Sequence, residues 1–345
     1  MTSIHEVAAL AGVSTATVSR VLSDSSHPVK ASTRQRVLDA ASQLDFQPNR
    51  LASGLARRRI QVVAVIVHDM MDEYFSEIAR GIEDAAYANG YVTLICNTDR
   101  SADKEVHYLR KLRSMRVDAV ILTAGGLRDP QSRADIAAQL ALLEQSGSMI
   151  VHLAPHGDGQ PDVGFSNQVG LQLAVDHLVE LGHTRIGFLR GPEHIETAEE
   201  RLAAMHDAMA RRGLTLDPSA NLVGGFSRDD GERAASAFVA AGCPASAVVC
   251  ANDQAAIGFL RGLRERGITV PDDVSIVGYD DIAPCHYVEP ALTTVHVPLH
   301  DLGSFGMRVA LELLGGSERQ DPIQLPLSLT VRSSTAPAED REAVR

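Results

Sequence analysis

Residues 11–22 read Ala-Gly-Val-Ser-Thr-Ala-Thr-Val-Ser-Arg-Val-Leu, and this stretch predicts the fold of the N-terminal segment. Apolar residues upstream recur at helical spacing up to Gly12, which supplies the tight turn of a helix–helix corner. Ser14 is a favourable N-cap for a second helix. That helix turns its valines inward and leaves hydroxyl groups and Arg20 outside, which is typical of a helix-turn-helix DNA reader. The alternative is an ordinary helical hairpin with a solvated face.

Two more signals complete a three-helix head. Ser3 and Glu6 form a Ser-x-x-Glu capping box at the start of the first helix. Residues 30–45 predict a third helix, which Ser32 with Gln35 could cap. We place this head at residues 1–47.

The charge of the chain is divided unevenly. Residues 1–59 hold eight Lys and Arg against four Asp and Glu, a net charge of +4, while the remaining 286 residues carry −16. A basic head on an acidic body confines the attraction for phosphate groups to one end of the chain.

The N-terminal segment resembles the LacI-type (lactose repressor) family of bacterial transcription regulators, and the resemblance continues to about residue 336. It is carried by five blocks in a specific order and spacing: Glu6-Val7-Ala8, Ala11-Gly12-Val13-Ser14, Thr17-Val18-Ser19-Arg20-Val21-Leu22, Thr33-Arg34-Gln35-Arg36-Val37 and Pro48-Asn49-Arg50-Leu51-Ala52. The resemblance implies contacts with double-stranded operator DNA from Ser14, Thr15, Ala16, Thr17, Ser19, Arg20, Asn49, Arg50, Ala52 and Leu55. It also implies a homodimer on a pseudo-palindromic operator.

Residues 48–59 are the predicted linker. The stretch after Pro48 is about two turns long and contains Gly54, so an isolated helix here would be marginal. The resemblance implies that this segment becomes a hinge helix when two copies pair on DNA and that Leu55 enters the minor groove. The alternative is a stray apolar residue in a flexible linker.

From Val62 onward, short apolar strands alternate with amphipathic helices, which predicts parallel sheets covered on both faces. Two such sets resemble the two-lobe α/β periplasmic-binding-protein fold at residues 60–337. We place the first lobe at about 60–161 and 296–322, and the second at about 162–295 and 323–337. The tail, 338–345, has no leucine heptad.

Ligands of such sheets bind beyond the carboxyl ends of the strands. The residues predicted there to contact an effector are Tyr74, Phe75, Arg201, Phe226, Asn252, Asp253 and Asp280. Arginine, asparagine and aspartate form paired hydrogen bonds with neighbouring hydroxyl groups, and phenylalanine packs on a sugar ring or a base. Simpler interpretations stay open: Asp253 as a helix cap, Tyr74 and Phe75 as core residues, and Arg201 as an exposed helix residue.

Two positions depart from the family pattern. Members often carry an aspartate after the strand that matches Met149–Leu153, where this chain reads Val151-His152-Leu153-Ala154, so that ligand is missing or replaced by His152. Purine-binding members have an arginine where Ile195 stands, which argues against a purine.

These observations predict a homodimeric transcription repressor controlled by a sugar or sugar derivative. Alternatives are a nucleoside-responsive regulator and a sugar-binding protein without a DNA function. No nucleophile elbow, phosphate loop or spaced carboxylate pair indicates an enzyme, and we expect no cofactor. The spacing of the four cysteines suits neither zinc nor a disulfide framework, and we expect no metal. Without a secretory signal or a membrane-spanning run, a cytoplasmic location is expected.

Overall fold

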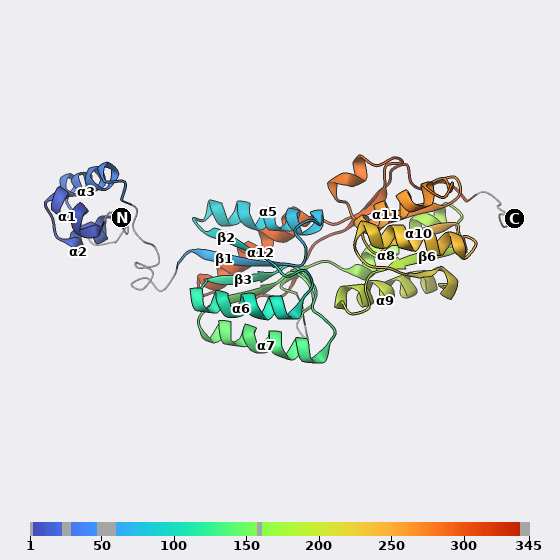
Figure 1. Cartoon of the computed structure of the whole chain (residues 1–345), viewed down its shortest axis with the longest axis horizontal. Helices are drawn as coiled ribbons and strands as arrows, with labels where there is room; N and C mark the ends of the chain where they lie inside the picture. The colour runs from blue at the N-terminus through green and yellow to red at the C-terminus, as the bar shows by residue number, and fades with distance from the viewer. Residues whose placement is uncertain (1–2, 23–28, 47–59, 157–160, 339–345) are drawn as a thin grey trace. The chain divides into compact units, whose positions relative to one another are not determined.

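The computed structural model describes residues 3–22, 29–46, 60–156 and 161–338. The chain divides into two compact units, Met1–Ile60 and Gln61–Arg345 (Figure 1).

The first unit contains α1 (Ile4–Ala11), α2 (Thr15–Leu22) and α3 (Ala31–Gln43). The capping box at the start of α1 is present: the Glu6 amide donates to Ser3 Oγ, and the Ser3 amide donates to the Glu6 carboxylate at 2.7 Å. Gly12 ends α1 with φ +63, a left-handed conformation that glycine adopts without steric cost. Valines and alanines from all three helices form a small core (Val7, Ala8, Ala11, Val18, Val21, Val37, Ala40 and Ala41).

Two local predictions for these helices have different outcomes. Ser14 caps α2 as predicted, because its hydroxyl accepts the Thr17 amide hydrogen at 3.2 Å. The expected cap of α3 is wrong. The helix begins at Ala31 after Lys30, which provides no side-chain cap, and Gln35 instead donates to Asp39 one turn further on. Because the backbone is already helical at Ala31, Ser32 lies inside the first turn and is not at the N-cap position.

The first lobe of the second unit is built on a four-stranded parallel sheet in the order β2-β1-β3-β4. Its strands are β1 (Val62–Val67), β2 (Val92–Asn97), β3 (Ala119–Leu122) and β4 (Met149–His152). Helices α5 (Glu73–Ala88) and α12 (Leu299–Leu314) pack together over one face, and α6 (Ala102–Met115) and α7 (Pro130–Gln145) cover the other (Figure 1). Thus α12 returns to this lobe from near the end of the chain.

The second lobe has a six-stranded sheet in the order β12-β10-β9-β8-β6-β7. Its strands are β6 (Ile186–Arg190), β7 (Asn221–Val223), β8 (Ala247–Cys250), β9 (Ser275–Asp280), β10 (Thr293–His296) and β12 (Ser328–Thr330). Helix α8 (Asn167–Glu180) packs on α9 (Glu196–Arg211), and α10 (Arg228–Ala240) packs on α11 (Asp253–Arg264). The carboxyl ends of β6, β8 and β9 therefore lie at one edge of the sheet.

The expectation of wholly parallel sheets needs one correction. Strand β12 runs antiparallel to β10, because the chain returns to the second lobe from the opposite direction after α12. The apolar pattern of residues 327–335 predicts a terminal strand there, but β12 is only three residues long. The short strands β7 and β10 were not predicted.

The lobes are joined where the chain crosses between them. Strands β5 (Val163–Gly164) and β11 (Ile323–Gln324) form a two-stranded parallel ladder at the crossings. Asp162 accepts hydrogen bonds there from the His152 amide and from Arg319. No helix in the described part of the chain combines the length and apolar character needed to span a bilayer.

Candidate functional site

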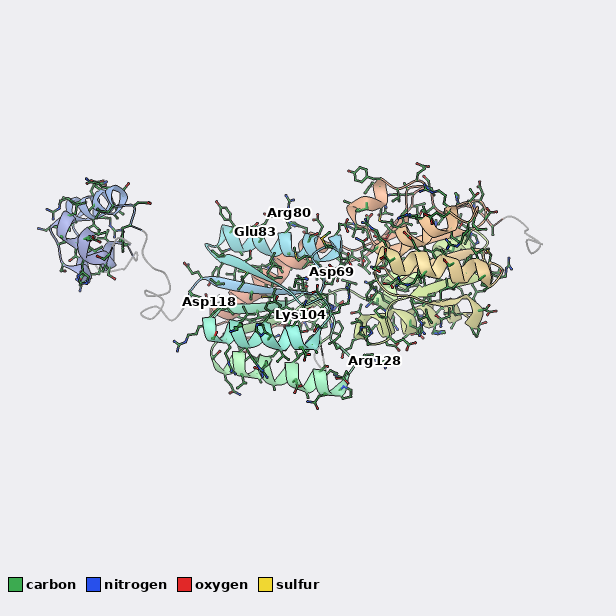
Figure 2. All side chains as sticks on the ribbon, viewed as in Figure 1. Asp69, Arg80, Glu83, Lys104, Asp118 and Arg128 are labelled. Carbon is green, nitrogen blue, oxygen red and sulfur yellow. The ribbon has the colours of Figure 1, made fainter. Side chains whose placement is uncertain are left out.

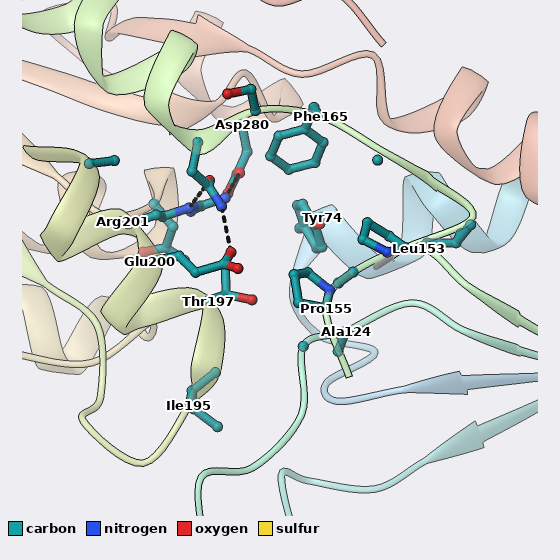
Figure 3. A pocket seen from close by; sticks show the side chains of 18 of the residues that line it. Tyr74, Ala124, Leu153, Pro155, Phe165, Ile195, Thr197, Glu200, Arg201 and Asp280 are labelled. Atoms are coloured by element: carbon teal, nitrogen blue, oxygen red, sulfur yellow. Dashed lines mark hydrogen bonds and ion pairs between the residues drawn. The ribbon is translucent and has the colours of Figure 1, made fainter. Parts of the chain in front are cut away.

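A cavity of about 450 Å³ lies between the two lobes of the second unit. Figure 3 shows Arg201, Glu200 and Asp280 on one side of it and Tyr74, Leu153 and Pro155 on the other. Six of the seven predicted effector contacts line this cavity, namely Tyr74, Phe75, Arg201, Phe226, Asn252 and Asp280. Strand ends of both lobes therefore meet at one concave site, as a ligand cleft requires.

Arg201 is fixed in place by several partners. Its side chain is nearly buried on α9 and donates to the Ala251 carbonyl, to Asn167 Oδ1 at 3.1 Å and to Asp280 Oδ1 at 3.2 Å. The guanidinium also lies 4.0 Å from the centre of the Tyr279 ring, within cation–π range. Burial opposes the charge of Arg201, but Asp280 together with Tyr279 and Tyr74 outweighs that effect, and the pKa of the guanidinium is raised. The arginine is held rigidly enough to orient a ligand.

Asp280 ends strand β9 in an unusual backbone conformation. Its φ is +116, which non-glycine residues rarely adopt and which costs conformational energy. The carboxyl group is buried beside Arg201, and its Oδ1 accepts the guanidinium hydrogen. Burial raises the pKa of Asp280 well above its ordinary value, while Arg201 lowers it. Strain of this kind occurs where a side chain must be aimed at a functional site.

Aromatic side chains supply apolar walls. Tyr74 and Phe75 open α5 and pack edge to face, with ring centres 5.0 Å apart. Phe226 lies under the guanidinium of Arg100 at 5.8 Å. Asn252 caps α11 through its side-chain oxygen, and its amide group holds the Phe226 carbonyl at 3.0 Å. Asn252 therefore positions the phenylalanine as well as lining the cavity.

The structure places Asp253 outside the cavity lining, which corrects the prediction that it contacts an effector. Its side chain is fully buried and turns back into the second lobe. One carboxylate oxygen accepts from Thr294 at 2.6 Å and the other from the Ile282 amide at 3.0 Å. Nor is Asp253 the helix cap, since Asn252 has that role. Asp253 ties α11 to the segments around β9 and β10.

The two departures from the family pattern have different positions. Ile195 lines the cavity and is 2% exposed, so it presents an apolar surface there. His152 lies outside the lining, next to His156 at a ring-centre distance of 5.7 Å. His152 is therefore no replacement for a missing ligand in the cavity.

Three contributors to the site were not predicted. Asn167 links the guanidinium of Arg201 to Glu200, and its sequence position suggested only a helix start. Asp72 caps α5 and faces the cavity from the first lobe. Arg100 forms part of the wall beside Phe226. The signal in the sequence for Asp72 was its own position, as an aspartate two residues before Tyr74 where it could cap the helix.

Two sets of contacts close the lobes on each other at the cavity. In the first, here named the Glu73 clasp, Glu73 of α5 accepts from Arg228 of α10 at 3.2 Å and from Gln254 of α11. In the second, the Arg128 amide donates to the His194 carbonyl at 2.9 Å, and its guanidinium pairs with Glu199 at 3.2 Å (Figure 2). The described structure is therefore one in which the lobes are in contact.

The head presents part of the predicted DNA-binding set. Ser14, Ala16, Ser19 and Arg20 are exposed on or beside α2, whereas Thr15 and Thr17 are half-buried. The predicted linker contacts Asn49, Arg50, Ala52 and Leu55 lie outside the described residues.

Comparison with known proteins decides the family. Residues 3–49 match the bacterial regulatory proteins of the lacI family, and residues 175–335 match the periplasmic binding protein-like domain. The transcriptional repressor PurR of Vibrio cholerae serotype O1 (strain M66-2) is 31% identical over 320 residues, which cover 93% of this chain and 94% of that protein. This chain belongs to the LacI family.

Two solved LacI-family structures extend the likeness to three dimensions. The lac repressor dimer bound to operator and the anti-inducer ONPF superimposes with a TM-score of 0.84 at 30% identity, covering 97% of this chain and 99% of that one. A LacI family regulator from Enterococcus faecium with bound ribose gives 0.72 at 30% identity, covering 81% and 100%. The chain is a transcription regulator with a helix-turn-helix head and an effector-binding body.

Proposed function

We propose that this regulator is a homodimeric repressor whose affinity for a pseudo-palindromic operator is controlled by a sugar or sugar derivative bound between the lobes. The observation that carries the proposal is the buried Arg201–Asp280 pair, which lines the cavity from the second lobe. An arginine and a carboxylate side by side offer a donor and an acceptor to neighbouring hydroxyl groups of one sugar ring. The ribose bound to the Enterococcus faecium regulator supports this ligand class.

A surface for self-association is present on the first lobe. Strand β2 is at the edge of its sheet and exposes Val92 and Ile95, and Tyr87 at the end of α5 is 79% exposed. Exposed apolar residues on an unpaired edge strand favour pairing with another chain. The lac repressor, to which this chain is similar, is a dimer in its operator complex.

The DNA contacts are assigned to α2 and the linker. Thr15 and Ala16 set the half-site preference, because short side chains at the start of a recognition helix suit contact with a thymine methyl group. Ser14, Thr17, Ser19 and Arg20 complete the reading face. Asn49, Arg50, Ala52 and Leu55 form the hinge contacts, with Leu55 in the minor groove.

A nucleoside is the alternative effector class. Phe226 and Tyr74 on the cavity walls could also stack on a base, which favours a nucleoside as the second candidate effector. The relatives that this chain resembles are regulators rather than enzymes, and we propose no catalytic activity for this chain. A repressor of bacterial genes acts in the cytoplasm, where its operator is.

The test combines a promoter-fragment gel shift with a thermal-shift screen of sugars and nucleosides. We expect salt-sensitive binding of a fragment and a change of its affinity in the presence of a stabilising compound. Arg201→Ala should abolish that change and retain DNA binding, because removing one partner of a buried charged pair costs roughly 2–5 kcal/mol. The control is Arg211→Ala, an exposed arginine on the same helix. If the compound still changes the DNA affinity of Arg201→Ala, Arg201 is not part of the effector site. If no promoter fragment binds, the proposed repressor function is wrong.

A further inference from the structure

Asp72 and Asp280 line the same cavity from opposite lobes. Asp72 is 7% exposed at the N-terminus of α5, and Asp280 is 3% exposed at the end of β9. Each uses one carboxylate oxygen within the protein: Asp72 Oδ1 accepts the Tyr74 amide hydrogen at 3.1 Å, and Asp280 Oδ1 accepts from Arg201. Among the described residues, the second oxygen of each has no hydrogen-bond partner. Two acceptors are thus free on opposite walls.

The remaining charges of the lining make the cavity negative. Four acids (Asp72, Glu200, Asp207 and Asp280) and two arginines (Arg100 and Arg201) line it. Each arginine is already near an acid, since Arg201 is paired with Asp280 and Arg100 lies 3.7 Å from Asp69, which is outside the lining. His68 adds no charge at neutral pH, because burial lowers its pKa to about 3. An anion entering this cavity would meet more acids than cations.

Asp72 is also the one acid that the first lobe contributes to this lining. The other first-lobe residues around it are largely apolar or aromatic, among them Phe75, Leu153 and Pro155. Burial raises the pKa of Asp72 to about 6, so its carboxylate is charged at pH 7.5. A ligand that bridges the lobes through hydrogen bonds needs a donor directed at this carboxylate.

We propose that Asp72 is a second anchor of the effector, opposite Asp280, and that it selects a neutral or positively charged hydroxylated ligand over phosphorylated and carboxylated ones. The inference rests on the proposed function, in which a sugar or nucleoside occupies this cavity. A hydroxyl or ammonium group of the ligand donates to Asp72, while a second hydroxyl is held by Arg201 and Asp280. The ligand thereby connects the lobes.

The first arm of the test is a calorimetric panel on the full-length protein at pH 7.5. Its matched compounds are glucose, glucosamine, glucose 6-phosphate and gluconate, then ribose with ribose 5-phosphate, and adenosine with its 5′-monophosphate. We expect binding by a neutral or amino compound and at least tenfold weaker binding by its phosphorylated counterpart. Tighter binding of any phosphorylated or carboxylated member would overturn the inference and leave the proposed function intact. Failure of every compound to bind would contradict the proposed effector class and, with it, this inference.

The second arm is Asp72→Asn, with Glu77→Gln on the same helix as the matched control. Asparagine caps a helix as well as aspartate, so α5 should begin at the same residue, and thermal unfolding without ligand checks this. We expect about a tenfold or greater loss of affinity for the bound compound, because a hydrogen bond to a charged acceptor becomes a neutral one. The ratio of the affinity for the neutral compound to the affinity for its phosphorylated counterpart should also decrease. A merely structural role of Asp72 would not change this ratio. Glu77 is exposed on the same helix and lies outside the lining, so its variant should bind normally. Unchanged affinity and ratio in Asp72→Asn would refute the role of Asp72.

Discussion

Glu105 of α6 is a buried carboxyl group next to a buried histidine. It is 2% exposed, and its Oε1 lies 3.6 Å from Nε2 of His156. Burial raises the pKa of Glu105 to about 7 and lowers that of His156 to about 4, an effect that His152 strengthens. Between these two values both side chains are neutral, and the pair is buried with the least cost of desolvation.

Glu105→Gln should therefore stabilise the protein in alkaline but not in acidic buffer. The pKa of Glu105 is higher in the folded than in the unfolded state, so its contribution is present below about pH 4.5 and is lost as the pH rises through 7. At pH 8 the wild type should be less stable than the variant by up to about 3 kcal/mol, from the size of the shift. Thermal unfolding at pH 5 and pH 8, with the exposed Glu144→Gln as a control, measures this. If Glu105→Gln is less stable than the wild type by the same amount at pH 5 and at pH 8, the carboxyl group is needed for packing.

Asp280 at the end of β9 and Asp253 at the start of α11 show what sequence reasoning predicts for single residues. Asp280 follows a buried strand and was predicted to face the cleft, whereas Asp253 fits the same rule and does not. The rule locates a residue at a sheet edge, but the side-chain direction depends on contacts distant in sequence. Asp253 is turned inward by Thr294, in a strand that had not been predicted. The positive φ of Asp280 likewise has no signal in the sequence.

Elements of six or more residues were easier to predict than shorter ones. The apolar run from Val62 to Val67 predicts a strand with the bounds that β1 has, because six apolar residues in succession suit a strand buried on both faces. Strand β5 has two residues and β7 three, too few to establish a period. The amphipathic pattern predicts a helix from Ala134 to Gln145, but α7 begins four residues earlier, at Pro130. Asp129 caps it, and that Asp-Pro pair was a usable signal.

The Glu73 clasp joins three helices from two lobes, and we expect it to favour the closed arrangement. Glu73→Ala removes the acceptor for both Arg228 and Gln254. The population of the closed form should fall, and the affinity for a ligand that requires closure should fall with it, by about threefold to tenfold. Calorimetry with the compound identified in the panel measures this. Glu77→Ala, an exposed acid one turn further along α5, is the control.

An unchanged ligand affinity in Glu73→Ala would contradict the role of the Glu73 clasp in closure. Unchanged affinity in Glu73→Ala, together with an unchanged radius of gyration in solution scattering, would show that these bonds follow closure rather than support it. Because Glu73 is partly exposed, each of its bonds contributes modestly, and the arginine pair alone should be worth less than about 1 kcal/mol.

At the scale of the whole molecule, the two units differ in both core and charge. The head has its own small core of valines and alanines, while the body has a large core with residues of both lobes and a second core under α6 and α7 in the first lobe. The head region carries +4 and the remainder −16. This division could be read from the sequence, since it depends on local composition. The contacts between the lobes could not, because they join segments that are far apart in the sequence, such as Arg128 with Glu199 and Glu73 with Arg228.

The last prediction concerns coupling between these units. A fragment of residues 61–345 retains the cavity and both lobe cores, so it should bind the effector within about twofold of the full chain. It should not bind DNA, because it lacks the basic head and its net charge repels phosphate groups. In the full chain, operator DNA should change the affinity for the effector by the same factor by which the effector changes the affinity for operator, since binding free energies are linked reciprocally. The fragment should show no such change. Calorimetry of both proteins with operator, and with unrelated DNA of the same length as a control, makes the comparison. If operator leaves the affinity of the full chain for the effector unaltered, the cavity is uncoupled from the head and the regulatory role proposed for it is wrong.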